Sequence, residues 1–167
     1  MKRWVWAALG VLGIWVVAQP WPAQAAAPEP TAVFPFQLVD TSGEPPGENH
    51  APALAAATAT LKSLLQKSGH YELVSLKPFA AQVASEQRDK CGECWVPVAR
   101  KAGARYAVVP FVHKVSTLIS TMDIWIADLE TMRYVVHMQG QLRGDTREAY
   151  VRGVTFLVGD QLGGRSG

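Results

Sequence analysis

Two adjacent segments in the C-terminal half of the chain alternate apolar and polar residues, and this period-2 pattern predicts a β-hairpin. In residues 117–127 the apolar face comprises Leu118, Met122, Ile124 and Ile126, and the other face comprises Thr117, Thr121, Asp123 and Trp125. In residues 133–142 the apolar face comprises Val136, Met138 and Leu142, and the other comprises His137, Gln139 and Gln141. A turn is expected at residues 128–131. The hairpin should therefore bury one face and leave the other wet.

The segment 106–112 is apolar at successive positions, which is typical of a central strand buried on both faces. Further strands are expected at 31–39 and 70–76. In the first of these, Phe34, Phe36 and Leu38 should share one side, and Pro35 indicates an edge position or a bulge.

Helical periodicity or helix-ending signals place helices at 51–67, 78–86 and 94–102, and a last amphipathic helix before residue 163. Asp145 should cap that last helix, with Glu148 completing a capping box. The fold class is therefore α/β (α+β): a mixed sheet of about five strands with crossover helices, a C-terminal meander and a final amphipathic helix.

The first 25 residues have the layout of a cleavable export signal. Lys2 and Arg3 precede an uncharged apolar run from Trp4 to Ala18, and residues 23–25 (AQA) form a small-x-small cleavage pattern. We expect cleavage after Ala25 or Ala27; the alternative is a retained anchor, although the run is shorter than the roughly 20 residues of a spanning helix. Residues 26–30 should be a disordered leader, 31–162 a single domain and 163–167 a frayed tail.

Removing the signal changes the charge balance. The full chain has 16 Lys and Arg against 14 Asp and Glu, and the signal holds two of the basic residues, so the remainder has 16 − 2 = 14 basic against 14 acidic residues. A formally neutral domain lacks the basic footprint of a nucleic-acid-binding protein. We expect a periplasmic protein with no transmembrane segment after cleavage.

Several segments together resemble a known group of proteins. Residues 32–36 (AVFPF), 69–74 (GHYELV) and 102–109 (AGARYAVV) resemble bacterial envelope proteins with a fold like the TolB N-terminal domain and the curli-secretion lipoprotein. Residues 113–119 (HKVSTLI) and 127–131 (ADLET) resemble, more closely, an uncharacterised family of exported bacterial proteins with a K-V-S-x-L-I signature. Met132 replaces the usual turn glycine, and the lipoprotein cysteine is absent, so no lipid anchor is carried over. The resemblance implies a shape and a compartment, and assigns no catalytic residue.

The only two cysteines, Cys91 and Cys94, form a C-x-x-C pair. In an exported protein the pair favours a structural disulfide, placed at the start of the helix before the central strand. A thioredoxin-like redox site is the alternative, although the polar run before Cys91 differs from the apolar strand that such a site requires. A zinc site is disfavoured because no two histidines have the expected close spacing, and we assign no metal.

The wet face of the hairpin is the main candidate for binding. Trp125, Asp123, His137 and Gln139 should lie together there, as a platform for a partner or ligand. The alternative is that the terminal helices cover this face, which would make Trp125 a core residue.

No nucleophile elbow, P-loop or dinucleotide motif is present in the sequence, and we assign no catalytic residue and no cofactor. The sequence thus predicts a non-enzymatic accessory or adaptor protein that binds a protein partner in an envelope assembly. The two alternatives are a thiol–disulfide protein using Cys91 and Cys94, and a small-ligand binding domain built around Trp125 and His137.

Overall fold

The structure, a computed structural model, describes residues 27–45 and 50–163. The expected export signal, residues 1–25, lies outside the described residues, as do positions 164–167 of the expected tail. The elements, in chain order, are β1 (Glu29–Val33), β2 (Gln37–Asp40), α1 (His50–Lys67), β3 (Tyr71–Val74), the 3-10 helix η1 (Lys77–Phe79), α2 (Ala80–Ser85), α3 (Val96–Lys101), β4 (Tyr106–Lys114), β5 (Ile119–Asp128), β6 (Arg133–Arg143) and α4 (Arg147–Gly163).

The strands form one mixed sheet in the order β3-β1-β4-β5-β6, with β2 also paired to β4. β1 and β2 run parallel to β4, and β3 runs parallel to β1. β4, β5 and β6 form the expected antiparallel meander. The fold class predicted from the sequence is therefore confirmed.

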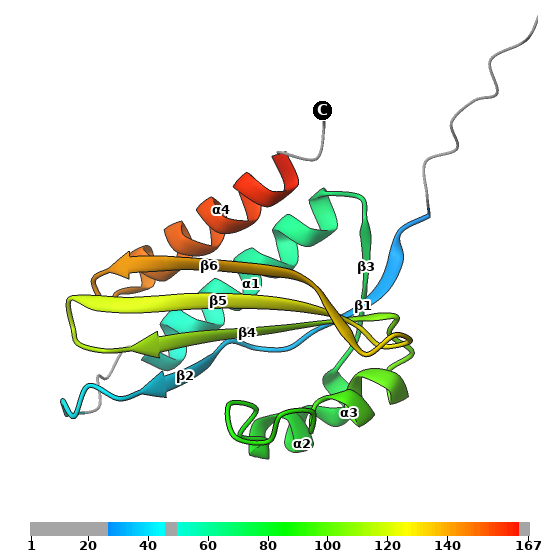
Figure 1. The fold of residues 1–167 in the computed structure, drawn as a ribbon, viewed down its shortest axis with the longest axis horizontal. Helices are drawn as coiled ribbons and strands as arrows, with labels where there is room; N and C mark the ends of the chain where they lie inside the picture. Colours follow the sequence, from blue (N-terminus) through cyan, green and yellow to red (C-terminus); the bar gives the residue numbers. More distant parts are fainter. Residues whose placement is uncertain (1–26, 46–49, 164–167) are drawn as a thin grey trace, which may run out of the picture.

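The helices lie on both faces of the sheet. Figure 1 shows α1 and α4 together on one side, and α2 and α3 on the other. The larger hydrophobic core, which we call the first core, lies on the side of α1 and α4. It includes Leu61 of α1, Val154 of α4 and Ile124 of β5. A second, smaller core beneath α2 and α3 contains Phe34 and Trp95. Among the described residues, no helix combines the length and apolar character that crossing a membrane requires.

The central strand supplies both cores, as its apolar run predicted. Val108 and Val112 of β4 are buried in the first core, whereas Ala107 and Val109 are buried in the second. Burial on both faces explains why this segment lacks alternation.

Pro35 interrupts the first strand, and the expectation of one continuous alternation over residues 31–39 was wrong. Val33 of β1 pairs with Val108 of β4, and Gln37 of β2 pairs with Phe111 of β4. The segment from β1 to β2 therefore has one residue more than the stretch of β4 opposite it. This one-residue bulge reverses the facing of the side chains that precede it. Phe34 consequently packs in the second core and Phe36 in the first, on opposite faces of the sheet. The bulge that Pro35 indicated is confirmed.

The N-terminal end of the domain differs from the sequence prediction. Glu29 and Pro30 fall in the predicted disordered leader, but they belong to β1 and pair with Tyr71 and Glu72 of β3. The ladder extends there because the Glu29 backbone N–H donates to the His70 carbonyl and the Arg105 N–H donates to the Pro30 carbonyl.

The last helix is capped by a residue other than the one predicted. Thr146 precedes α4, and its Oγ1 accepts a hydrogen bond from the Ala149 backbone N–H at 3.2 Å. Asp145 is not the cap because its carboxylate is held instead by His50, Lys114 and Tyr150.

Candidate functional site

The face of β5 and β6 opposite α1 and α4 presents aromatic and polar side chains. Trp125 lies directly across the ladder from His137, and Asp123 directly across from Gln139. Tyr134 of β6 completes the group, and we call these five residues the aromatic face. Trp125 and Asp123 are half-buried, whereas His137, Gln139 and Tyr134 are exposed. The sequence prediction that Trp125, Asp123, His137 and Gln139 share one face is therefore matched by their placement; a binding role for them stays a prediction.

Trp125 and His137 form a stacked pair. Their ring centroids lie 3.4 Å apart with an angle of 5° between the planes. The His137 Nε2 atom is hydrogen-bonded to Oδ1 of Asp123 at 2.8 Å, which fixes the orientation of the imidazole. Three side chains from two strands thus hold one another in place, and Trp125 presents a rigid apolar surface beside polar groups.

Tyr134 joins this face through an irregularity that the alternation of the sequence does not reveal. The register of β5 and β6 shifts between Ile126 and Ala127, so that Ala127 lies opposite Tyr134 and Val135 is the extra residue. The bulge brings the Tyr134 ring to 5.1 Å from that of Trp125. The tyrosine side chain is 55% exposed. Partial burial, and to a smaller extent the charge of Glu93, raises the pKa of the Tyr134 hydroxyl, which keeps it a neutral donor at physiological pH.

The disulfide loop lies on the same side of the sheet. Cys91 and Cys94 are joined as a disulfide, with their Cα atoms 5.5 Å apart. Because α3 begins at Val96, the pair lies in the turn before the helix and not at its first residue. The Trp95 indole N–H donates to the Gly92 carbonyl at 2.9 Å, and the Trp95 ring meets Phe34 edge to face at 6.3 Å. The disulfide thus closes the turn that anchors Trp95 in the second core.

A polar cluster surrounds Lys114 at the C-terminal end of β4, where the lysine side chain is 1% exposed. Its Nζ atom is 3.2 Å from Glu44, 3.4 Å from Asp145 and 3.7 Å from Asp40. Burial acts to lower the pKa of Lys114, but these three carboxylates outweigh it and the net pKa is raised. Lys114 is therefore charged and fully paired, which makes it a structural link between β4, the loop after β2 and the start of α4.

Asp145 is the centre of that cluster. It accepts from the Tyr150 hydroxyl and lies 2.5 Å from Nε2 of His50. Burial acts to raise the pKa of Asp145, but the hydrogen bonds of His50 and Tyr150 and the charge of Lys114 lower it overall. The same carboxylate, together with burial as the larger cause, raises the pKa of the Tyr150 hydroxyl.

The four histidines occupy separate surroundings. His50 contacts Asp145, His113 contacts Thr41, His137 contacts Asp123, and the His70 ring meets Tyr71 at 6.4 Å. Within residues 27–45 and 50–163, no three His, Cys, Asp or Glu side chains are grouped to hold a metal ion.

Comparison with known proteins gives a family and a fold. Residues 29–162 match the model of the DUF3280 family, whose description is "Protein of unknown function (DUF2380)". No curated protein matches the chain significantly.

Three solved structures with a similar fold are distant in sequence. The crystal structure of lipoprotein GNA1162 from Neisseria meningitidis is 11% identical with a TM-score of 0.55, covering 84% of this chain and all of the other, 100%. The LpoB C-terminal domain from Salmonella enterica is 18% identical with a TM-score of 0.51, covering 72% of this chain and 87% of that one. The NMR structure of E. coli LpoB is 20% identical with a TM-score of 0.52, and the match covers 73% of this chain and 60% of that one.

Proposed function

We propose that this chain, which belongs to the DUF3280 family of proteins of unknown function, is an exported accessory protein of the bacterial envelope that binds a protein partner through the aromatic face. The proposal gives the domain a binding role and no catalytic one. Its location follows from the export signal expected at residues 1–25, and it is supported by a fold that a lipoprotein shares.

The observation that carries the proposal is the stacked pair of Trp125 and His137 on a sheet face that α1 and α4 do not cover. Aromatic side chains dominate the binding energy of protein interfaces, and they contribute most where little side-chain entropy is lost on association. The stack and the bond from His137 to Asp123 already restrict these rings before a partner binds. Gln139 and Tyr134 add exposed hydrogen-bonding groups at the edge of the same patch, as the polar rim of an interface requires.

The arrangement favours binding over catalysis. Among the described residues, the His137 imidazole is hydrogen-bonded to Asp123 and to no hydroxyl or thiol that it could activate. The ring also lies flat on Trp125, so one of its faces is covered. A general base would need its free nitrogen directed at a substrate proton, whereas this geometry uses His137 as a flat contact surface.

The proposal is tested by capturing partners from the envelope fraction with the tagged full chain. Variants His137→Ala and Gln139→Arg alter exposed positions of the face, and Phe156→Ala on α4, where the ring is 72% exposed, is the matched control. We expect one defined protein to be captured by the unchanged chain and by the control. His137→Ala should capture at least tenfold less of it, as the loss of a central contact implies. Gln139→Arg should also capture less of it, because it adds bulk and charge at the edge of the patch.

Two results would contradict this function. Capture that is unaffected by His137→Ala and Gln139→Arg would place the partner elsewhere on the surface. A chain that captures no protein but turns over a small molecule would show that the domain is an enzyme.

A further inference from the structure

A groove lies beside the break at Pro35, between α1 and α2. One cavity of about 360 Å³ lies between β1, the end of β3 and α2, and a second of about 520 Å³ lies along α1. Pro35 and Lys62 line both cavities, so the two are adjacent at these residues. Each is within the volume range of small-molecule pockets, roughly 300–1,000 Å³.

The lining of the groove is mainly apolar. Val33 and Val83 are buried at the floor of the first cavity, and Val74 and Leu76 are half-buried beside them. Ala80 and Ala84 of α2 form its outer wall, and the second cavity continues along alanines of α1. Small side chains at the wall keep the groove open over the length of both cavities.

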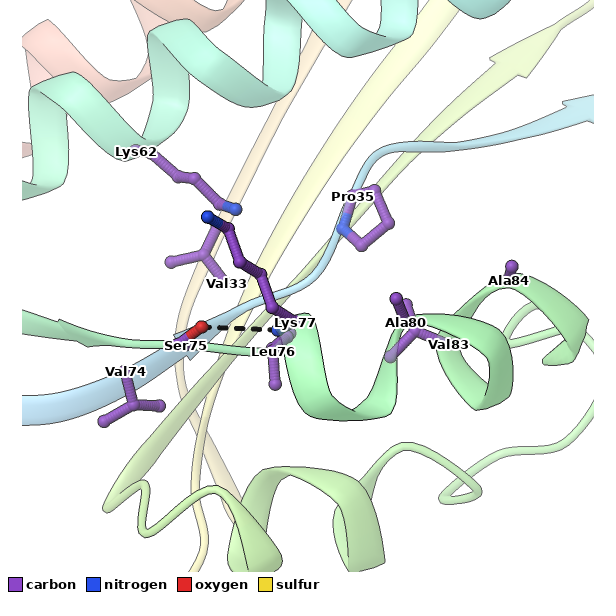
Figure 2. Close-up of a pocket in the computed structure, with 10 residues that line it drawn as sticks. All are labelled: Val33, Pro35, Lys62, Val74, Ser75, Leu76, Lys77, Ala80, Val83 and Ala84. Carbon is purple, nitrogen blue, oxygen red and sulfur yellow. Dashed lines mark hydrogen bonds between the residues drawn. The ribbon is translucent and has the colours of Figure 1, made fainter.

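Two lysines stand over this apolar surface. Figure 2 shows the side chains of Lys62 from α1 and Lys77 from η1 converging at the mouth of the first cavity, with their ammonium groups directed toward each other. No ion pair is formed by either lysine within the described part of the chain, whereas Lys114 is surrounded by three carboxylates. Two unpaired like charges over an apolar floor are electrostatically complementary to one anion attached to a hydrocarbon.

We propose that this groove binds a single-chain fatty carboxylate, with the carboxylate between Lys62 and Lys77 and the hydrocarbon chain on the apolar floor. This inference is independent of the aromatic face and goes beyond the proposed partner binding. It assigns the domain a second site, for an anionic amphiphile.

A peptide strand fits this groove less well. A peptide has a donor and an acceptor at nearly every residue, and burying them unpaired is costly. Two backbone groups at the break already have partners: the Pro35 carbonyl accepts from Nη2 of Arg88, and the Phe36 N–H donates to Oγ1 of Thr58. A hydrocarbon chain needs no such partners, so it is the occupant that the lining favours.

The test is a calorimetric titration of the full chain with dodecanoate, kept below its critical micelle concentration. Acetate supplies the anionic head alone, and dodecyltrimethylammonium supplies the same chain with a cationic head. We expect saturable binding of dodecanoate. Acetate should bind at least tenfold more weakly because it has no hydrocarbon chain to bury on the apolar floor. Dodecyltrimethylammonium should also bind at least tenfold more weakly, because it cannot accept charge-assisted hydrogen bonds from the two lysines.

Variants locate the site. Lys62→Gln with Lys77→Gln should weaken dodecanoate binding tenfold or more, and Ala84→Trp should block it by filling the cavity. Lys67→Gln, an exposed lysine near the end of α1 that lines neither cavity, should leave binding unchanged. Circular dichroism confirms that each variant is folded.

Three results would overturn the proposal: no saturable binding of dodecanoate, equal binding of the cationic amphiphile, or binding that persists unchanged in Ala84→Trp.

Discussion

Helix α4 lies against β6 through two glycines, and replacing one of them should destabilise the domain. A Cβ added at Gly153 of α4 would overlap Cδ2 of the buried Leu142 on β6, and one added at Gly140 of β6 would lie 2.9 Å from Cδ2 of Leu157 on α4. The two leucines thus occupy the space that the two glycines leave, in a reciprocal arrangement. Gly153→Ala must therefore displace Leu142 from a packed site.

The magnitude follows from two opposing terms. Overpacking a core costs about 1–3 kcal/mol, and replacing a helical glycine by alanine gains about 1 kcal/mol. Gly159 lies in the same helix, is exposed and has nothing within 4 Å of an added Cβ, so Gly159→Ala should show the gain alone. The propensity term cancels between the two variants, and Gly153→Ala should be less stable than Gly159→Ala by about 1–3 kcal/mol.

Urea unfolding of the two variants and the unchanged protein measures this difference, provided that the slopes agree. Adding Leu142→Ala removes the displaced side chain, so its destabilising effect should be smaller in the Gly153→Ala background than alone, and a double-mutant cycle should return a favourable coupling. Gly153→Ala that is as stable as Gly159→Ala, or a cycle without coupling, would refute the close approach of α4 and β6.

Three further predictions concern the disulfide, the second core and the acidic cluster. Cys91→Ala with Cys94→Ala should lower the free energy of unfolding by about 2 kcal/mol, the loop-closure value for so short a loop, and leave the domain folded; a disulfide in rapid exchange with glutathione would instead favour the redox role. Trp95 is 2% exposed, so Trp95→Ala should lower the free energy of unfolding, measured in urea, by about 3–5 kcal/mol. A loss below about 1 kcal/mol would contradict the anchoring role of Trp95. Asp145 has a folded pKa below its ordinary 3.8, so it stabilises the fold above that pH and this contribution is lost as the pH falls through the lower folded pKa. Asp145→Asn should therefore flatten the fall of stability below pH 3.8, and an unchanged acid limb would show that Asp145 is not the group responsible.

The alternating segments and the order of the elements could be predicted from the sequence. In a half-buried strand, apolar side chains occupy the buried face and polar side chains the exposed face, so the pattern indicates which way each residue points. The facing of Trp125 and His137, and the two-sided burial of β4, follow directly from that alternation. What alternation leaves open is which face the helices cover. The sequence left both possibilities for Trp125, and the structure places α1 and α4 on the opposite side.

Features that depend on a one-residue shift or on a distant partner could not be predicted. The facing of Phe34 was wrong because the extra residue at Pro35 reverses it, and Tyr134 was missed because a second bulge turns it toward Trp125. Asp145 had the local pattern of a helix cap, but His50, Lys114 and Tyr150 compete for its oxygens from elsewhere in the chain. Burial of Lys114 likewise requires carboxylates that only the folded chain brings together.

Site-specific photo-crosslinking in envelope fractions shows directly whether a partner binds the aromatic face. A photoreactive phenylalanine analogue is placed at Gln139, next to the stack, or at Phe156 on α4, where an exposed aromatic already stands. We expect one discrete crosslinked protein from position 139, absent from position 156 and lost when His137→Ala is added. No adduct at 139, or the same adduct from both positions, would contradict it.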